Sequence, residues 1–238
     1  MSSSLKDDRG FNQIFIPSSY STNKRMERRA DYIISQFKSD PGDVLEIGCG
    51  MGIMANMIAE KTKANMLGID LCEPFIEYAN KNFQRSNLSF GIMDFNQPDD
   101  FKTHKFDYIV GNGILHHLYF NLDNALTNIK SLLKPGGKII FMEPNIYNPY
   151  CHVIFTYPYF RKKASLEPTE MAFSKPFINK KLSSIGYKNI KIEYKDFLLP
   201  GIPKFLVKPS IFIGAIAEKI PLVKMVSQSI FISAENDQ

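Results

Sequence analysis

The fold is decided by one stretch, Val44-Leu45-Glu46-Ile47-Gly48-Cys49-Gly50-Met51-Gly52. It begins as an apolar run typical of a strand, turns at a cluster of glycines and continues as a helical pattern. Gly48 and Gly50 allow backbone conformations and a close ligand approach that a Cβ would forbid. A strand, a glycine turn and a helix in this order predict a ligand site at the carboxyl edge of a parallel sheet.

Strands and helices alternate downstream of this stretch. Further strands are predicted at Asn65–Asp70, Leu88–Met93, Phe106–Val110, Lys138–Met142, Asn189–Tyr194 and Ser229–Ala234. Helices are predicted at Arg25–Phe37, Gly52–Glu60, Glu73–Asn82, Asn121–Leu133 and Lys175–Ile185. Alternation at these lengths indicates βαβ units, and so an α/β fold with a parallel sheet and helices on both faces.

The chain is long enough for one domain. Its 238 residues, 44% of them hydrophobic, can supply one sizeable core. We expect a single domain over residues 1–238 with four parts: a helical lead over 1–42, a ligand-binding core over 43–145, a cap and helix over 146–185, and C-terminal strands over 186–238. The cap is rich in aromatic residues and is expected to be irregular. An amphipathic insertion is expected at 203–226.

Charge and cysteine content narrow the class of protein. The formal charge of +5, from 29 basic and 24 acidic residues, is spread along the chain and so favours a solvated surface over a nucleic-acid footprint. The three cysteines lie far apart, with neither a metal-site nor a disulfide spacing. The first residues lack the apolar run of a signal peptide. We therefore expect a reduced, cytoplasmic protein that uses no metal and does not bind nucleic acid.

The residue types at the turn separate two ligand classes. A dinucleotide fingerprint needs a glycine where this chain has Ile53. Glu46 places a negative charge beside the turn, which suits a cationic ammonium or sulfonium group better than a pyrophosphate. The turn therefore predicts a positively charged ligand, and a nicotinamide-dependent oxidoreductase is a minor alternative.

Two more acids close the next strands. Asp70 ends the second strand, where a carboxylate can accept hydrogen bonds from both hydroxyls of a ribose. Asp94 ends the third strand and could accept a hydrogen bond from the exocyclic amine of adenine. Leu71, Met93 and Phe95 would supply apolar partners for the ring. The acids together indicate a ligand that carries both ribose and adenine.

These features resemble the class I S-adenosylmethionine-dependent methyltransferases of the small-molecule type. The resemblance is carried by Glu46–Gly52, Gly68–Leu71, Asp94, Phe106–Val110 with Asn112, and Leu132–Gly137. It implies S-adenosylmethionine as cofactor and a Rossmann-like, seven-stranded, mostly parallel sheet whose last strand is antiparallel. By the same resemblance Glu46 and the turn face the methionine part. The implied cofactor-binding residues are Glu46, Gly48, Cys49, Gly50, Gly52, Asp70, Leu71, Met93, Asp94, Phe95 and Asn112.

Two histidines are the candidates for catalysis. His116 and His117 follow the fourth strand at the ligand-binding edge, and a general base with a pKa near neutral helps when the acceptor is a hydroxyl or an acidic carbon. Packing or loop hydrogen bonds are the alternative, because a histidine pair here is common in the family without a fixed role. Glu143 and Glu170 are further pocket candidates, each expected rather to be structural or solvated.

The acceptor is expected to be a small molecule. Nucleic-acid amino-methyltransferases carry Asn/Asp-Pro-Pro-aromatic where this chain has Asn112-Gly113-Ile114-Leu115, which disfavours a flipped base as acceptor. The aromatic cap fits a lipid-like or ring-shaped acceptor as well as a core. We therefore expect O-, N- or C-methylation of a small-molecule or lipid-like acceptor. A catalytically inactive, cofactor-binding partner subunit is the alternative.

The insertion at 203–226 has two interpretations. Its apolar residues alternate with lysines, so it could be a lid over the pocket or a peripheral contact with a membrane. Pro203, Pro209 and Pro221 are expected to break any long amphipathic helix, which favours the lid. Neither the oligomeric state nor the pathway follows from the sequence.

Overall fold

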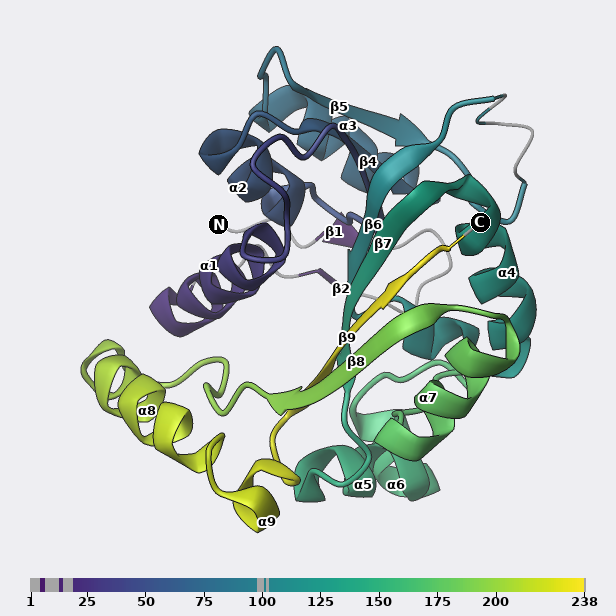
Figure 1. Ribbon diagram of the computed structural model, residues 1–238. Coiled ribbons are helices and arrows are strands. Elements are labelled where there is room, and N and C mark those ends of the chain that lie inside the picture. The colour runs from purple at the N-terminus through teal and green to yellow at the C-terminus, as the bar shows by residue number, and fades with distance from the viewer. Residues whose placement is uncertain (1–4, 7–12, 15–18, 98–100, 102, 238) are drawn as a thin grey trace.

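The computed structural model describes residues 5–6, 13–14, 19–97, 101 and 103–237, and its centre is one seven-stranded sheet. The strand order is β5-β4-β3-β6-β7-β9-β8; β9 runs antiparallel to its neighbours β7 and β8, and the other neighbouring strands pair in parallel (Figure 1). This confirms the predicted sheet. The strands are β3 (Asp43–Ile47), β4 (Asn65–Asp70), β5 (Leu88–Ile92), β6 (Phe106–Asn112), β7 (Leu133–Pro144), β8 (Lys188–Lys195) and β9 (Ser229–Glu235).

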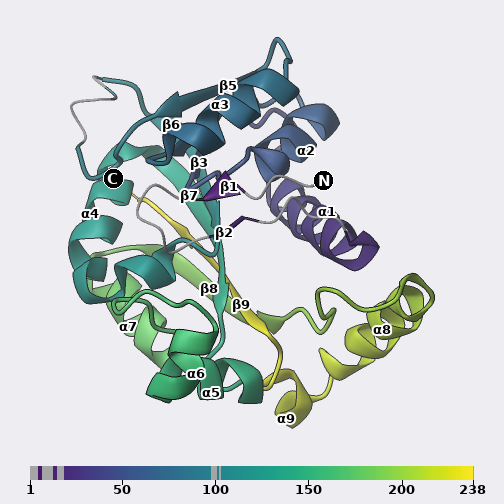
Figure 2. The same cartoon turned by 180° about the vertical axis from the view of Figure 1, so that it is seen from behind.

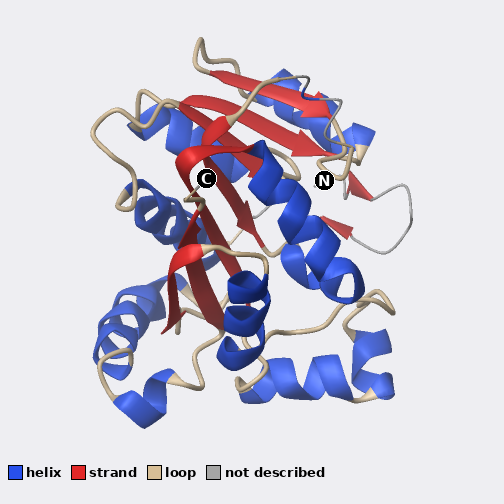
Figure 3. Cartoon of the chain, turned by 45° about the vertical axis from the view of Figure 1, so that its right-hand side comes forward, coloured by secondary structure: helices blue, strands red, loops and turns tan. Residues whose placement is uncertain are grey.

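Helices cover both faces of the sheet, as predicted (Figure 3). Successive residues of a strand point to opposite faces, so Val44 packs with α1 and α2 while Leu45 packs with α4 and α7. Both cores are almost entirely aliphatic and aromatic. The main helices are α1 (Tyr20–Ile34), α2 (Ile53–Lys61), α3 (Glu73–Asn82), α4 (Leu122–Leu132) and α7 (Lys175–Ser184), with a 3-10 helix η2 at Leu115–Asn121.

The N-terminal lead is helical only from Tyr20 onward. α1 begins before the predicted Arg25 because the side chain of Ser19 accepts a hydrogen bond from the Thr22 amide at 3.1 Å and so caps the helix. Two short strands, β1 (Leu5–Lys6) and β2 (Gln13–Ile14), pair antiparallel ahead of it. Much of the predicted lead before residue 19 lies outside the described residues.

Helices replace the irregular structure expected in the cap. α5 (Pro149–Thr156) and α6 (Pro158–Lys163) each begin at a proline, a residue suited to the first helical position because the missing N–H has no partner there anyway. The Asn148 side chain caps α5 by accepting from the amides of Tyr150 and Cys151. The prediction of an irregular segment is therefore wrong for these residues.

The insertion forms two helices, α8 (Lys204–Ala217) and α9 (Pro221–Lys224). α9 does begin at a proline, but α8 runs through Pro209, which contradicts the expected break. Packing outweighs the lost hydrogen bond, because Val207 before the proline and Gly214 after it are both buried. Within the described part of the chain, no helix combines the length and apolarity that crossing a bilayer requires.

A buried arginine joins the two ends of the chain. Arg29 of α1 donates to Asp196 Oδ2 at 2.7 Å, to Ser229 Oγ at 2.7 Å and to Asn112 Oδ1 at 2.5 Å. Burial lowers the pKa of Arg29 to about 10, against the opposing effect of Asp196, so the guanidinium stays charged near neutral pH. Arg25 also donates to Asp196 Oδ2, at 2.6 Å. α1 is thereby tied to the ends of β6 and β8 and the start of β9.

Replacing Arg29 by Ala should cost about 3 kcal/mol of unfolding free energy, since it leaves the buried carboxylate of Asp196 and the half-buried amide of Asn112 without their main donor. Urea denaturation followed by circular dichroism measures the loss. The matched control is Arg28→Ala on the same helix, at a half-buried position, expected within about 0.5 kcal/mol of the parent. Equal losses from both substitutions would contradict the role given to Arg29.

Candidate active site

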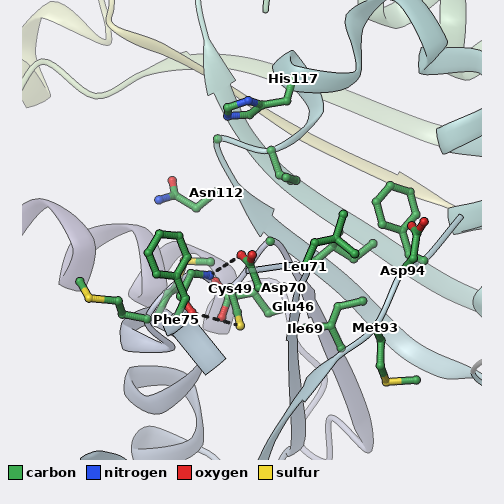
Figure 4. A pocket seen from close by; sticks show the side chains of 18 of the residues that line it. Glu46, Cys49, Ile69, Asp70, Leu71, Phe75, Met93, Asp94, Asn112 and His117 are labelled. Carbon is green, nitrogen blue, oxygen red and sulfur yellow. Dashed lines mark hydrogen bonds between the residues drawn. The ribbon is translucent and has the colours of Figure 1, made fainter. Parts of the chain in front are cut away.

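A cavity of about 410 Å³ lies where the first parallel strands end. Its size suits a small-molecule ligand, and its position is the ligand-binding edge of an open α/β sheet. Figure 4 shows its lining, with His117 on the opposite side of the cavity from Glu46 and Asp70. The predicted site residues that line it are Glu46, Gly48, Cys49, Gly50, Asp70, Leu71, Met93, Asp94, Phe95, Asn112 and His117.

Two predicted residues do not line this cavity. Gly52 caps the start of α2 with φ +75°, and a Cβ there would come within 2.5 Å of the Phe90 ring, so its place is in the packing of the turn. Gly48, with φ +66°, does line the cavity, and a Cβ on it would meet Ile114 at 2.7 Å. The ring of His116 has its centroid 4.2 Å from that of His117, but His116 is not part of the lining. The ligand contacts assigned to all of these residues stay predictions.

Asp70 holds the glycine turn in place. Its Oδ2 accepts from the Gly50 amide and its Oδ1 from the Cys72 amide, both at 2.9 Å. One carboxylate thus joins the turn after β3 to the turn after β4. Each carboxylate oxygen has a further lone pair, so the group can still accept hydrogen bonds from a ligand in the cavity.

Glu46 carries the strongest electrostatic signal at the site. The residue is 2% exposed, and its Oε2 has no hydrogen-bond partner among the described residues. Burial raises the pKa of Glu46 to about 8, and the charge of Asp70 adds to this, while a hydrogen bond with the Ala55 amide opposes it. A buried polar atom without a partner is costly. A cationic ligand in the cavity would supply the partner, so the residues present fit such a ligand.

The far end of the cavity is apolar with one acid. Asp94 Oδ1 accepts from the backbone amide of Asn96 at 2.9 Å and from its side chain at 3.1 Å, which fixes the loop after β5. Met93 and Phe95 line the cavity on either side of this acid, and Leu71 lines it while remaining 56% exposed. A flat ring with a polar edge would match this combination.

Glu143 organises the loop that carries the histidines. Its Oε1 accepts from the amides of Ile114 and Leu115, and its Oε2 accepts from the amide of His116. The same Oε2 lies 2.8 Å from Nδ1 of the His116 ring, so a protonated Nδ1 donates to it. At 1% exposure, Glu143 fixes both the start of η2 and the ring of His116. It is structural, as expected.

His117 faces the cavity and is paired with an acid of the cap. Its Nδ1 lies 3.1 Å from Glu170 Oε1. Burial lowers the pKa of His117, but the hydrogen bond to Glu170 and the charges of Glu170, Glu167 and Glu143 outweigh it, so the pKa is raised above 6.5. Burial raises the pKa of Glu170, but the hydrogen bond and the charge of His117 more than offset this effect. The pKa of Glu170 is therefore lowered. The Nδ1 atom of His117 is therefore held by Glu170.

The same residues contain a cluster with metal-ligating atoms. His116, His117 and Glu170 each offer one such atom, all within 4.8 Å of one another. The Nδ1 atom of each histidine already has a carboxylate partner. That of His116 pairs with Glu143, and that of His117 pairs with Glu170. Hydrogen bonding therefore accounts for the cluster.

Comparison with known proteins identifies the domain. Residues 45–139 match the model of the methyltransferase domain family. A solved SAM-dependent methyltransferase from Archaeoglobus fulgidus superposes with a TM-score of 0.64 at 19% identity, over 90% of this chain and 94% of that one. Residues 45–139 therefore resemble a methyltransferase domain, and the chain has the fold of that methyltransferase.

Two curated proteins are similar to about half of this chain. The malonyl-[acyl-carrier protein] O-methyltransferase of Acetivibrio thermocellus is 26% identical over 127 residues, which are 52% of this chain and 43% of that protein. The ubiquinone biosynthesis O-methyltransferase of Actinobacillus pleuropneumoniae is 34% identical over 124 residues, 49% of this chain and 52% of that protein. The chain thus spans only about half the length of these relatives.

Several residues that line the cavity had no clear signal in the sequence. Met26 reaches the cavity from α1, and Phe75, Ile114 and Leu118 complete its apolar lining. Such residues look like ordinary core positions in a sequence, because only the tertiary packing decides whether they face a cavity. The apolar face of the first helix was the one available hint for Met26.

The pairing of His117 with Glu170 can be measured directly. Glu170→Gln removes the acid that contributes most to raising the pKa of His117, so that pKa should fall. NMR titration of the ring protons measures it. His152, exposed on α5, is the internal control and should not respond. An unchanged or higher pKa of His117 would rule out the pairing.

Proposed function

We propose that this protein binds S-adenosylmethionine in the cavity and transfers its methyl group to a small-molecule or lipid-like acceptor. The observation that carries the proposal is the buried carboxyl group of Glu46, whose Oε2 has no partner among the described residues. It lies beside a glycine turn in a methyltransferase domain. A carboxylate in that place suits a ligand with a positive charge.

Different parts of S-adenosylmethionine would bind to different residues that the fold already holds in place. Glu46 would accept from the ammonium of the methionine part, and Asp70 from the ribose hydroxyls. Asp94 would accept from the amine of adenine, with Met93 and Phe95 against the ring. Because Asp70 and Asp94 are already held by backbone amides, they need little reorganisation to bind.

His117 would act on the acceptor. When bound, the cofactor supplies a methyl group on a sulfonium, so the protein's main tasks are to orient the acceptor and exclude water. His117 Nε2 would take the proton that a hydroxyl or an acidic carbon loses, and Glu170 would stabilise the resulting imidazolium. His116 positions His117, since their rings lie 4.2 Å apart and Glu143 fixes His116.

The names of the curated relatives point to oxygen as the acceptor atom. One is named for a malonyl group on a carrier protein and the other for ubiquinone biosynthesis, and both names specify O-methylation. We propose an acceptor with an acidic hydroxyl or an acidic carbon, in which a deprotonated form is reached at moderate pH. A general base at His117 would serve such an acceptor.

The role of Glu46 predicts a pH dependence for cofactor binding. Below its pKa of about 8, the free protein holds Glu46 protonated, whereas an ammonium ligand favours the carboxylate. The affinity for S-adenosylhomocysteine should therefore rise between pH 6 and 7.5, by at most about tenfold per unit. Calorimetry should also detect a proton released on binding. Glu46→Gln should bind more weakly, with a flat profile; equal slopes for both proteins would contradict this role.

Methyl transfer itself is tested with labelled cofactor. The protein is incubated with S-adenosylmethionine carrying a heavy methyl group and with separate small-molecule and lipid extracts, and mass spectrometry identifies compounds that gain the label. His117→Gln should lower their formation by roughly 10²- to 10⁴-fold while keeping affinity for S-adenosylhomocysteine. His152→Gln is the control and should act like the parent. The absence of cofactor binding at millimolar concentration would overturn the proposed function.

A further inference from the structure

The exposed apolar side chains of this protein are concentrated in two segments. Of the twenty exposed large apolar side chains in the described part of the chain, five lie in residues 147–160 and ten in residues 205–226. Several are almost fully open to solvent, including Tyr159 at 72%, Phe205 at 77% and Leu222 at 79%. Contiguous exposed apolar surface on this scale usually marks an interaction site.

The two segments form one surface. The Asn145 side chain donates to the carbonyls of Met225 and Ser227, and the Asn148 side chain donates to the carbonyl of Val226, all at 2.8 Å. These bonds fix α9 against the start of α5. Figures 1 and 2 show α5, α6, α8 and α9 together along the lower edge of the molecule in both views. We call the exposed side chains of these four helices the apolar face.

Positive charge accompanies the apolar face, and no acid projects from it. Residues 147–163 contain no Asp or Glu, and residues 203–226 contain only Glu218. Glu218 is turned inward, where its carboxylate accepts from the Asp196 amide at 3.0 Å and from Lys195 at 3.4 Å. The exposed or half-exposed lysines on the face are Lys162, Lys163, Lys204, Lys208, Lys219 and Lys224.

α8 has one buried side and one exposed apolar side. Val207 and Gly214 are buried and attach the helix to the domain, whereas Phe212 and Ile213 are 69% and 63% exposed. Among the described residues, the cavity has no lining residue from 203–226. The insertion thus offers its apolar side outward, which favours a partner other than the cofactor cavity and argues against the expected lid.

We propose that the apolar face binds the surface of an anionic lipid bilayer. Exposed phenylalanine, leucine and isoleucine side chains would enter the boundary between headgroups and acyl chains, where tyrosines also prefer to lie. The surrounding lysines would meet negatively charged headgroups. A surface with six lysines and no outward acid matches a negatively charged bilayer better than a typical protein interface, whose centre is depleted of lysine. Bilayer binding does not require methyl transfer.

Cosedimentation with vesicles tests the proposal on the full chain. The protein should pellet with vesicles of phosphatidylcholine and phosphatidylglycerol, and at least about tenfold less with phosphatidylcholine alone. Phe212→Ser with Leu222→Ser should reduce binding to the anionic vesicles by about tenfold or more, because both side chains lose their insertion. Lys208→Glu with Lys219→Glu should reduce it by a similar factor.

Matched controls come from elsewhere on the surface. Phe120→Ser removes a side chain that is 72% exposed outside the apolar face, and Lys63→Glu with Lys180→Glu reverses two exposed lysines far from it in the sequence. Both should bind like the parent, and circular dichroism should show every variant folded. Absence of parent binding, or equal effects of face and control variants, would overturn the proposal. Self-association without vesicle binding, removed by the same face variants, would assign the face to a second copy instead.

Discussion

The carboxylate of Asp70 is the constraint on which the rest of the site depends. It bonds the amide of Gly50 with one oxygen and that of Cys72 with the other, so two crossover turns of the sheet are held at one point. Gly48 can then pack against Ile114 with no Cβ between them. The closed turn forms one wall of the cavity. A ligand there meets a backbone already in its binding conformation.

The buried Glu46 lowers the stability of the protein without a ligand. Its pKa of about 8 lies above the ordinary value of 4.5, so the unfolded chain loses this proton more easily than the folded one. The group therefore destabilises the ligand-free fold progressively as pH rises from about 4.5 to 8. A bound cation reverses this effect by favouring the carboxylate. Glu46 therefore destabilises the protein without a ligand and favours the binding of a positively charged one.

The sequence predicted what is local and missed what depends on packing. The strands, the glycine turn, Glu46 and Asp70 follow one another within short motifs, so their types and spacing identified them. The pairing of His117 with Glu170 joins residues 53 positions apart, and no periodic pattern connects them. Glu143 could not be distinguished from any acid at a strand end until its bonds to three amides of η2 were known. The break predicted at Pro209 was wrong because buried residues before and after the proline hold α8 against the domain.

The cap connects the histidines with the apolar face through Arg161. Its guanidinium donates to the carbonyl of Phe155 in α5 and to those of Glu167 and Glu170, which holds the segment carrying Glu170 beside His117. Phe155 in turn lies edge-on to the His116 ring, with centroids 6.0 Å apart. The helices that expose tyrosines to solvent are therefore the ones that place the acid of the proposed base. Arg161 therefore links the position of α5 and α6 to that of the acid paired with His117.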